Sequence, residues 1–402
     1  MTSKGIAAAS ALALLAVLAP LAAQDGKAAL ARGPVVSLAA SGPVIEVVVP
    51  EGTSDLTLRY KWPALDEARR APFEAVSGRR LRAKLEGVPA ATAVAYDVLD
   101  GTAQVVTSGT LDALPAADAK KLTFCALGDS GFPGPGGGRP RFEQLSIARL
   151  LDDQKPDLAI HTGDIVYLVG QPQGFDPLFF QPYAATLRRV PFFITLGNHD
   201  VKTKNGQPTR DEFPFPTNEH GNDYYSFDAA NVHFACLDSN EVLKSESAES
   251  FLATAQGKWL KTDLAAAKSV WRIVFCHHPL FTVSTQRSTD SNTMRAILEK
   301  LLDEAGVDIV LTGHEHFYHR TERLRDGKPS AEGMVHIITG GGGAPLYKGE
   351  PKKDLTAAFA SRFHLTRFDV EGLTMRVRAM GVDAQGAPEV FDEVTLTSRR
   401  AQ

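Results

Sequence analysis

Aspartate, asparagine and histidine side chains recur where five strand-like apolar runs end. The five segments are GDSG with Asp129, GDIVY with Asp164, GNHD with Asn198, HHP with His277, and GHEH with His314 and His316. In open α/β sheets, ligands bind beside the carboxyl ends of the strands. Each residue alone would fit a capped turn, but five such strand ends together favour a shared binding site.

The residue types at these strand ends indicate metal chemistry. Carboxylates, amide oxygens and imidazoles are ligands for hard and borderline cations. Gly313 permits a turn that places His314 and His316 on one side, because alternate residues of an extended segment face the same way. The set is larger than one ion needs, so the sequence predicts two metal ions that share a bridging carboxylate.

Tyr167, three residues after Asp164, has two interpretations. It stands among Ile165, Val166 and Leu168, and an aromatic residue in such a run usually packs in the core. The alternative is that its phenol joins Asp164 in the metal site. The local sequence favours the core interpretation.

The segments that carry these residues are typical of an α/β domain. From residue 121 to 395, apolar strands alternate with helical patterns at 142–153, 257–268 and 293–306. Such strands are covered by helices on both faces. Residues 363–396 read as a β-meander that extends a sheet. The glycine-rich loop 132–140 lacks the GK[ST] of a phosphate-binding loop.

The preceding residues, 35–112, read as a separate all-β sandwich, because short alternating runs are separated by turn residues. Within it, LEGVPAATAVAYDV resembles the fibronectin type III pattern. One short stretch is basic, and its alternating pattern favours the interpretation that these side chains form the solvated face of a strand: Arg79, Arg80, Arg82 and Lys84. Residues 111–121 are predicted to link the two domains.

Composition limits the classes of function. The chain has 402 residues and a net charge of −4, which argues against a protein-wide nucleic-acid surface. Residues 1–23 read as a signal peptide, with Lys4 before an apolar run and small residues near Ala23. We therefore expect a secreted or periplasmic protein without a stable membrane span after signal removal. Cys125, Cys236 and Cys276 are expected to be buried, unpaired thiols.

The order GDSG, GDIVY, GNHD, HHP, GHEH resembles that of the calcineurin-like metallophosphoesterases. The GDxxY form is similar to the purple acid phosphatase branch, as are YYSFDAANVHFACLDS, GKWLKTDL and GHEHFYHR. The sequence departs from that branch in having GNHD where GNHE is usual. The resemblance implies a metallophosphoesterase-type β-sandwich flanked by helices at 121–395, preceded by a purple acid phosphatase-like or fibronectin III-like sandwich at 35–112.

The resemblance also implies the ligand sets. Asp129, Asp164, Tyr167 and His316 would hold Fe(III). Asp164, Asn198, His277 and His314 would hold Zn, Mn or Fe(II), with Asp164 bridging. His277 is preferred to His278 because the family pattern is His-x-Pro.

The implied function is hydrolysis of small phosphate monoesters by direct attack of a metal-bridging hydroxide. His199 would protonate the leaving group, Asp200 would orient His199 and raise its pKa, and Asn198, His199 and His220 would contact the substrate. The first alternative is a phosphodiesterase or nucleotide-cleaving enzyme with the same metals. A second is a binding protein whose sandwich is the working part. The sequence does not indicate an oligomeric state.

Overall fold

The computed structural model describes residues 30–39, 42–53, 55–213, 223–284 and 287–401. The predicted signal peptide and His220 lie outside the described residues. None of the helices in the described ranges combines the length and apolar character needed to cross a bilayer.

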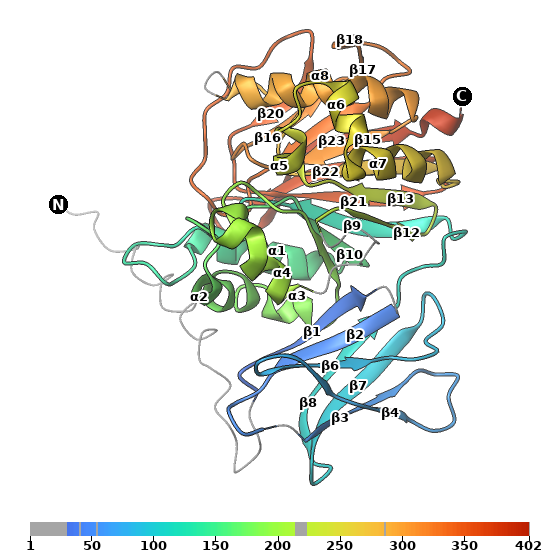
Figure 1. Cartoon of the computed structure of the whole chain (residues 1–402), viewed down its shortest axis with the longest axis vertical. Helices are drawn as coiled ribbons and strands as arrows, with labels where there is room; N and C mark the ends of the chain where they lie inside the picture. The colour runs from blue at the N-terminus through green and yellow to red at the C-terminus, as the bar shows by residue number, and fades with distance from the viewer. Residues whose placement is uncertain (1–29, 40–41, 54, 214–222, 285–286, 402) are drawn as a thin grey trace, which may run out of the picture.

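The amino-terminal part forms two four-stranded antiparallel sheets, which lie below the rest of the molecule in Figure 1. In sheet order they are β1 (Arg32–Ala39), β2 (Gly42–Val48), β6 (Arg80–Lys84) and β5 (Glu74–Ser77), and β4 (Arg69–Pro72), β3 (Leu56–Lys61), β7 (Ala93–Asp100) and β8 (Val105–Asp112). Alternate residues such as Ile45, Leu58 and Val94 are fully buried between them. The predicted all-β region is thus confirmed, whereas its fibronectin likeness and its boundaries stay predictions.

Two larger sheets form the remainder. The six-stranded sheet has the order β11 (Phe192–Ile194), β10 (Leu158–His161), β9 (Lys121–Leu127), β21 (Leu365–Glu371), β22 (Thr374–Val382) and β23 (Pro388–Thr397). The seven-stranded sheet has the order β12 (Tyr225–Ala229), β13 (Val232–Cys236), β14 (Trp271–Phe275), β15 (Ile309–Thr312), β19 (Val335–Thr339), β16 (Tyr318–Thr321) and β20 (Thr356–Ala360). A small hairpin pairs β17 (Leu324–Arg325) with β18 (Lys328–Pro329).

The two large sheets pack face to face around aromatic side chains. Phe124 of β9 stacks on Phe368 of β21 with ring centroids 4.4 Å apart, and meets Phe234 of β13 edge-on at 5.2 Å. Strands β10 and β15 are buried along their whole length. That pattern is expected where parallel strands are covered on both faces.

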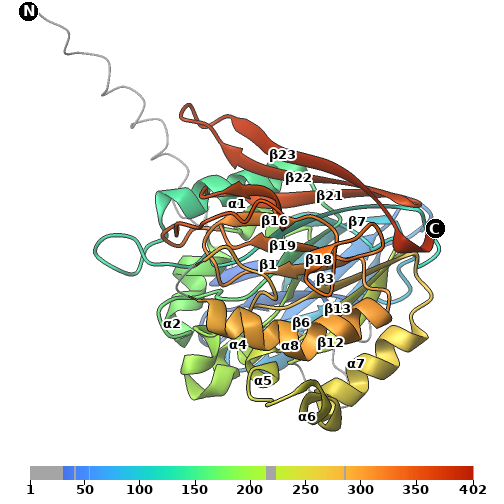
Figure 2. The same cartoon turned by 90° about the horizontal axis from the view of Figure 1, so that it is seen from above.

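Helices cover the outer faces of these sheets. They are α1 (Phe142–Gln154), α2 (Pro172–Phe175), α3 (Ala184–Leu187), α4 (Gln207–Glu212), α5 (Ser239–Val242), α6 (Ala248–Ala253), α7 (Ala255–Ala266) and α8 (Ser288–Glu304). Short 3-10 or π turns span Asp176–Phe180, Asp200–Lys202, Lys204–Gly206 and Arg399–Ala401. Figure 2 shows β21, β22 and β23 on one side of the molecule and α5 to α8 on the other. Leu264 of α7 and Leu298 of α8 pack into the apolar cluster against the seven-stranded sheet.

The predicted layers are confirmed: an α/β sandwich of two mixed sheets, flanked by helices, follows an all-β region. The predicted carboxyl-terminal meander is β21 to β23, which extends the six-stranded sheet. Strands β16 and β20 were not predicted. The sequence YHRT of β16 is polar yet buried, because Arg320 forms an ion pair with Asp392.

The prediction that the basic side chains of β6 face solvent is wrong for Arg80. This side chain is buried, lies 3.3 Å from Glu46 and donates to the carbonyl of Glu212 in α4. It therefore contacts the larger part of the molecule and does not face solvent.

Candidate metal centre

The seven residues predicted as metal ligands lie together at the carboxyl ends of strands from both large sheets. Asp129, Asp164 and Asn198 follow β9, β10 and β11. His277 follows β14, and His314 and His316 follow β15, while Tyr167 follows Asp164. Except for Asn198, all are buried.

The first cluster contains Asp129, Tyr167 and His316. The Tyr167 hydroxyl lies 3.0 Å from Oδ1 of Asp129 and 2.9 Å from Nε2 of His316, and these two atoms are 3.4 Å apart. Nδ1 of His316 donates to the carbonyl of Pro345 at 2.7 Å. That bond fixes the ring so that the lone pair of Nε2 faces the tyrosine, as second-shell carbonyls do for metal-binding histidines.

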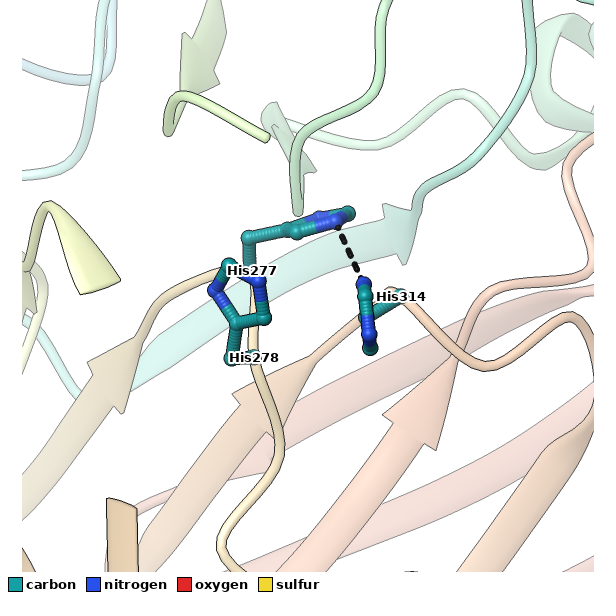
Figure 3. Close-up of side chains that lie close together, drawn as sticks. All are labelled: His277, His278 and His314. Carbon is teal, nitrogen blue, oxygen red and sulfur yellow. Dashed lines mark hydrogen bonds between the residues drawn. The ribbon is translucent and has the colours of Figure 1, made fainter. Parts of the chain in front are cut away.

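The second cluster contains Asn198, His277 and His314. The side-chain oxygen of Asn198 lies 3.0 Å from both Nε2 of His277 and Nδ1 of His314. These two nitrogens are 3.2 Å apart, as the dashed line in Figure 3 marks. Nδ1 of His277 donates to the carbonyl of Thr162 at 2.9 Å, which leaves its Nε2 as an acceptor.

Asp164 links the two clusters. One of its carboxylate oxygens lies 3.6 Å from Nε2 of His277, and the other accepts the backbone N–H of His199 at 2.8 Å. Ligand atoms of Asp129, Asp164 and His277 all lie within 4.8 Å of one another. The carboxylate therefore occupies the place between the clusters that a bridging ligand requires.

The donor atoms fit bound cations. The side-chain oxygen of Asn198, Nε2 of His277 and Nδ1 of His314 lie within 3.2 Å of one another, and such a set of oxygen and nitrogen donors suits a borderline cation. Burial, together with the neighbouring His277, holds the pKa of His314 well below its usual value. That histidine is therefore in the neutral form that binds metals.

Tyr167 both packs and faces the clusters. Its ring lies 5.3 Å from the ring of Phe132 and 4.5 Å from that of His199. Burial, followed by the charges of Asp129 and Asp164, raises the pKa of its hydroxyl well above the usual range. Ionisation of the phenol would thus require a cation beside it, and the core interpretation of this residue is incomplete.

Backbone strain marks three of these positions. Asp129, Asp164 and His314 have φ values of 57°, 54° and 68°, in the left-handed region that residues other than glycine rarely adopt. Such strain is characteristic of functional sites. A Cβ at Gly197 would lie 2.1 Å from an oxygen of Asp164, so the adjacent turn needs glycine.

The structure corrects the expected role of Asp200. Its carboxylate accepts backbone N–H groups of Asp164 at 2.8 Å, Ile165 at 3.0 Å and Gly197 at 2.8 Å, and does not orient His199. Asp200 instead holds the turn that presents Asp164. Nδ1 of His199 contacts the carbonyl of Leu168 at 2.5 Å, and burial lowers the pKa of His199, opposite to the expected direction.

His278, the neighbour of the preferred ligand His277, is buried behind the second cluster. Its Nδ1 is 2.8 Å from the hydroxyl of Ser239, and its ring centroid is 4.5 Å from that of His314. Burial, followed by the charge of His277, lowers the pKa of His278 to about 3. Figure 3 shows the three histidines His277, His278 and His314 side by side.

Sequence reasoning missed two residues beside the clusters. The ring of Tyr347 stacks on the imidazole of His316, with centroids 4.0 Å apart and an interplanar angle of 13°. Arg287 donates to the carbonyl of His314 at 3.0 Å. The glycine-rich segment before Tyr347 was the available signal for a functional loop.

Comparison with known proteins agrees with this arrangement. Residues 122–318 match the family model described as calcineurin-like phosphoesterase. They form a calcineurin-like phosphoesterase domain. The chain is 32% identical to purple acid phosphatase 18 of Arabidopsis thaliana over 238 residues, which are 55% of this chain and 50% of that protein. The predicted resemblance is confirmed, although the chain spans only about half the length of this curated relative.

Two solved structures share the fold. The purple acid phosphatase PPD1 from yellow lupin (Lupinus luteus) seeds superposes with a TM-score of 0.75 at 16% identity, covering 90% of this chain and 74% of its own. A structure of PhoD gives a TM-score of 0.69 at 13% identity, covering 94% and 92%. Both likenesses extend over the amino-terminal sheets as well as the phosphoesterase domain, because they cover at least 90% of the chain.

Proposed function

We propose that the chain is an exported dinuclear-metal phosphatase that hydrolyses phosphate monoesters. The observation that carries this proposal is the pair of donor clusters linked by Asp164. In the proposed assignment, Asp129, Asp164, Tyr167 and His316 hold Fe(III), a hard ion suited to two carboxylates and a phenolate. Asp164, Asn198, His277 and His314 hold Zn, Mn or Fe(II), which suit the larger share of nitrogen.

The proposed mechanism is direct hydrolysis without a covalent enzyme intermediate. When bound, the two cations would neutralise charge on the phosphate oxygens and supply a nucleophile by lowering the pKa of water. His199 would donate a proton from Nε2 to the leaving oxygen in its imidazolium form, and because burial lowers the pKa of His199 this step would be favoured at acidic pH. The Leu168 carbonyl supports this role because it accepts the proton on Nδ1 and so fixes the ring.

Export rests on the sequence of the first residues. Lys4, the apolar run 6–18 and the small residues near Ala23 have the order of a cleavable signal. Amino-terminal sequencing of the protein recovered from its native host tests this part of the proposal, which predicts a mature chain that begins close to residue 24.

The test of the catalytic proposal is the pair of variants Asn198→Ala and His316→Ala. Each should lose bound metal and reduce hydrolysis of p-nitrophenyl phosphate by about 100-fold or more, because each removes a ligand of one cluster. His233→Gln is the matched control, since His233 is a buried histidine outside the clusters. Full activity and full metal content in His316→Ala would contradict the two-metal assignment.

The same assay separates the competing functions. Faster turnover of bis-p-nitrophenyl phosphate than of p-nitrophenyl phosphate would replace the monoesterase by the phosphodiesterase alternative. Absence of both metal and hydrolysis in protein from a metal-replete culture would favour the binding-protein alternative.

A further inference from the structure

Arg287 is a positively charged side chain fixed beside the donor clusters. Its Nη1 donates to the carbonyl of His314 at 3.0 Å, and its Nη2 donates to the hydroxyl of Tyr347 at 2.8 Å. The guanidinium carbon also lies 4.5 Å from the centre of the Tyr347 ring. Arg287 is therefore anchored directly to the backbone of His314 and, through the Tyr347 ring that stacks on His316, indirectly to His316.

Arg287 forms no ion pair within the described residues, although its charge acts on the buried carboxyl group of Glu315, whose pKa burial raises to about 7. Within the described ranges, Arg287 has no carboxylate oxygen within 4.0 Å, and both acceptors that hold it are uncharged. Within the described residues, Arg272 and Arg323 likewise donate only to backbone carbonyls, so Arg287 is distinguished by its place beside the donor clusters and not by its lack of an ion pair. A guanidinium that is fixed at this place without a carboxylate partner within 4.0 Å is suited to bind an external anion.

The chemistry of the guanidinium defines that anion. Arginine has five N–H donors in a planar fork, and the two contacts above leave donors free for another acceptor. A fork of this kind matches the oxygens of a phosphate or a carboxylate.

We propose that Arg287, positioned by Tyr347, binds a second oxyanion of the substrate, so that the site favours phosphate esters that carry a further phosphate or carboxylate near the scissile group. This proposal rests on the proposed phosphatase function and assigns its substrate class. The reaction remains hydrolysis: water adds to phosphorus, the bond to the leaving oxygen breaks, and pyrophosphate, for example, yields two orthophosphates.

Three substrates test the proposal: phenyl phosphate without a second oxyanion, 2-phosphoglycolate with a carboxylate and pyrophosphate with a second phosphate. Arg287→Met should lower kcat/KM for at least one of the last two by about 10- to 100-fold, chiefly through KM, and change phenyl phosphate by less than about 3-fold. Arg287→Lys should retain part of the preference, because it keeps the charge but not the fork. Which substrate responds identifies the second group.

Arg295→Met is the matched control. Arg295 is also half-buried, lies in α8 and stacks on an aromatic ring, Phe281, at 5.3 Å, but the structure places it in no contact with the clusters. It should change kcat/KM by less than about 3-fold for all three substrates, as expected for a surface substitution. Equal losses of Arg287→Met on all three substrates, or no loss on any, would overturn the proposal.

Metal content separates substrate binding from support of the His314 turn. If Arg287→Met loses metal, the variant Tyr347→Phe tests whether Arg287 binds substrate. This variant keeps the ring over His316 and removes only the hydroxyl that anchors Arg287. It should selectively raise KM for the doubly anionic substrate by about 3- to 10-fold; an unselective effect rejects the proposal. If the wild type hydrolyses none of the substrates, the proposed phosphatase function is wrong. Calorimetry with pyrophosphate and orthophosphate then tests Arg287 alone, because Arg287→Met should weaken the binding of pyrophosphate more than that of orthophosphate.

Discussion

At the scale of single residues, Tyr167 shows how a local pattern can mislead. Its neighbours in sequence are apolar, and its ring does pack on Phe132. Its hydroxyl nevertheless lies between Asp129 and His316, which are far from it in sequence. Only the convergence of several strand ends, and not the sequence next to the tyrosine, indicates its proposed role as a ligand.

Tyr167→Phe tests that role. The substitution keeps the packing but removes the oxygen, so we expect metal content of the first cluster and phosphatase activity to fall by about 10-fold or more. If iron is bound, the visible tyrosinate absorption should disappear. Elemental analysis and absorption spectra provide the measurements.

Tyr96→Phe is the control for loss of a buried hydroxyl. Tyr96 donates to the carbonyl of Arg188 at 2.7 Å, away from the clusters, and its loss should cost about 1 kcal/mol of unfolding free energy without a change in metal. A Tyr167→Phe protein that matched Tyr96→Phe in metal, colour and rate would restore the core interpretation.

The sequence predicted which ligands converge but not what orients them. Strand ends and glycines can be recognised in the amino-acid sequence. The groups that orient His277, His316 and His199 are backbone carbonyls, namely those of Thr162, Pro345 and Leu168. Every residue type has a backbone carbonyl, so these partners leave no signal in composition or spacing. Asp200 was misassigned for a related reason, because its partners are backbone N–H groups and not the adjacent histidine.

At the scale of elements, a buried histidine ties α7 to the β12–β13 edge of the seven-stranded sheet. His233 in β13 lies 3.0 Å from Asp228 in β12 through Nδ1 and 2.9 Å from Asp263 in α7 through Nε2. Burial alone would lower the pKa of His233, but the hydrogen bonds that its ring donates to Asp228 and Asp263 outweigh burial and raise the pKa to about 9.

This pair of contacts predicts a specific pH dependence. Because the folded pKa lies above the unfolded value near 6.5, the stabilisation is complete below pH 6.5 and is lost as pH rises through about 9. We expect the unfolding free energy to fall by about 3 kcal/mol over that range as His233 loses its proton. Denaturant unfolding from pH 6 to 10 measures the loss.

His233→Gln supplies the comparison for this measurement. Glutamine keeps hydrogen-bonding capacity without a titrating group, so the variant should be less stable than the wild type at pH 6 and show a flatter dependence above it. Parallel curves for the two proteins would show that His233 does not titrate as proposed.

At the scale of the whole molecule, the sequence predicted the layers better than their connections. Periodicity placed the major helices and the strands that carry the clusters, because each has a clear apolar pattern. The pairing of β9 with β21, more than 200 residues later, has no local signal. The same holds for the contact of the amino-terminal sheets with the larger part, where Arg80 is buried by residues of α4.

Arg32 in β1 contributes several interactions to that contact. Its guanidinium lies 2.7 Å from Asp176 and 2.6 Å from Glu212, and 3.8 Å from the ring centre of Phe180. The side chain of Arg32 is 12% exposed and that of Glu212 19%, whereas that of Asp176 is 57% exposed, so the pair with Glu212 is the less screened of the two.

Arg32→Ala should therefore lower the unfolding free energy by about 2 kcal/mol, since it removes two ion pairs and the aromatic contact together. Arg32→Lys should lose about half as much, because it keeps the charge without the planar fork. Lys121→Ala is the control: its ion pair with Glu371 is exposed on both sides and should contribute about 0.5 kcal/mol or less. Denaturant titration of the three variants measures these effects. Equal effects of Arg32→Ala and Lys121→Ala would mean that the Arg32 interactions contribute little to holding the two parts together.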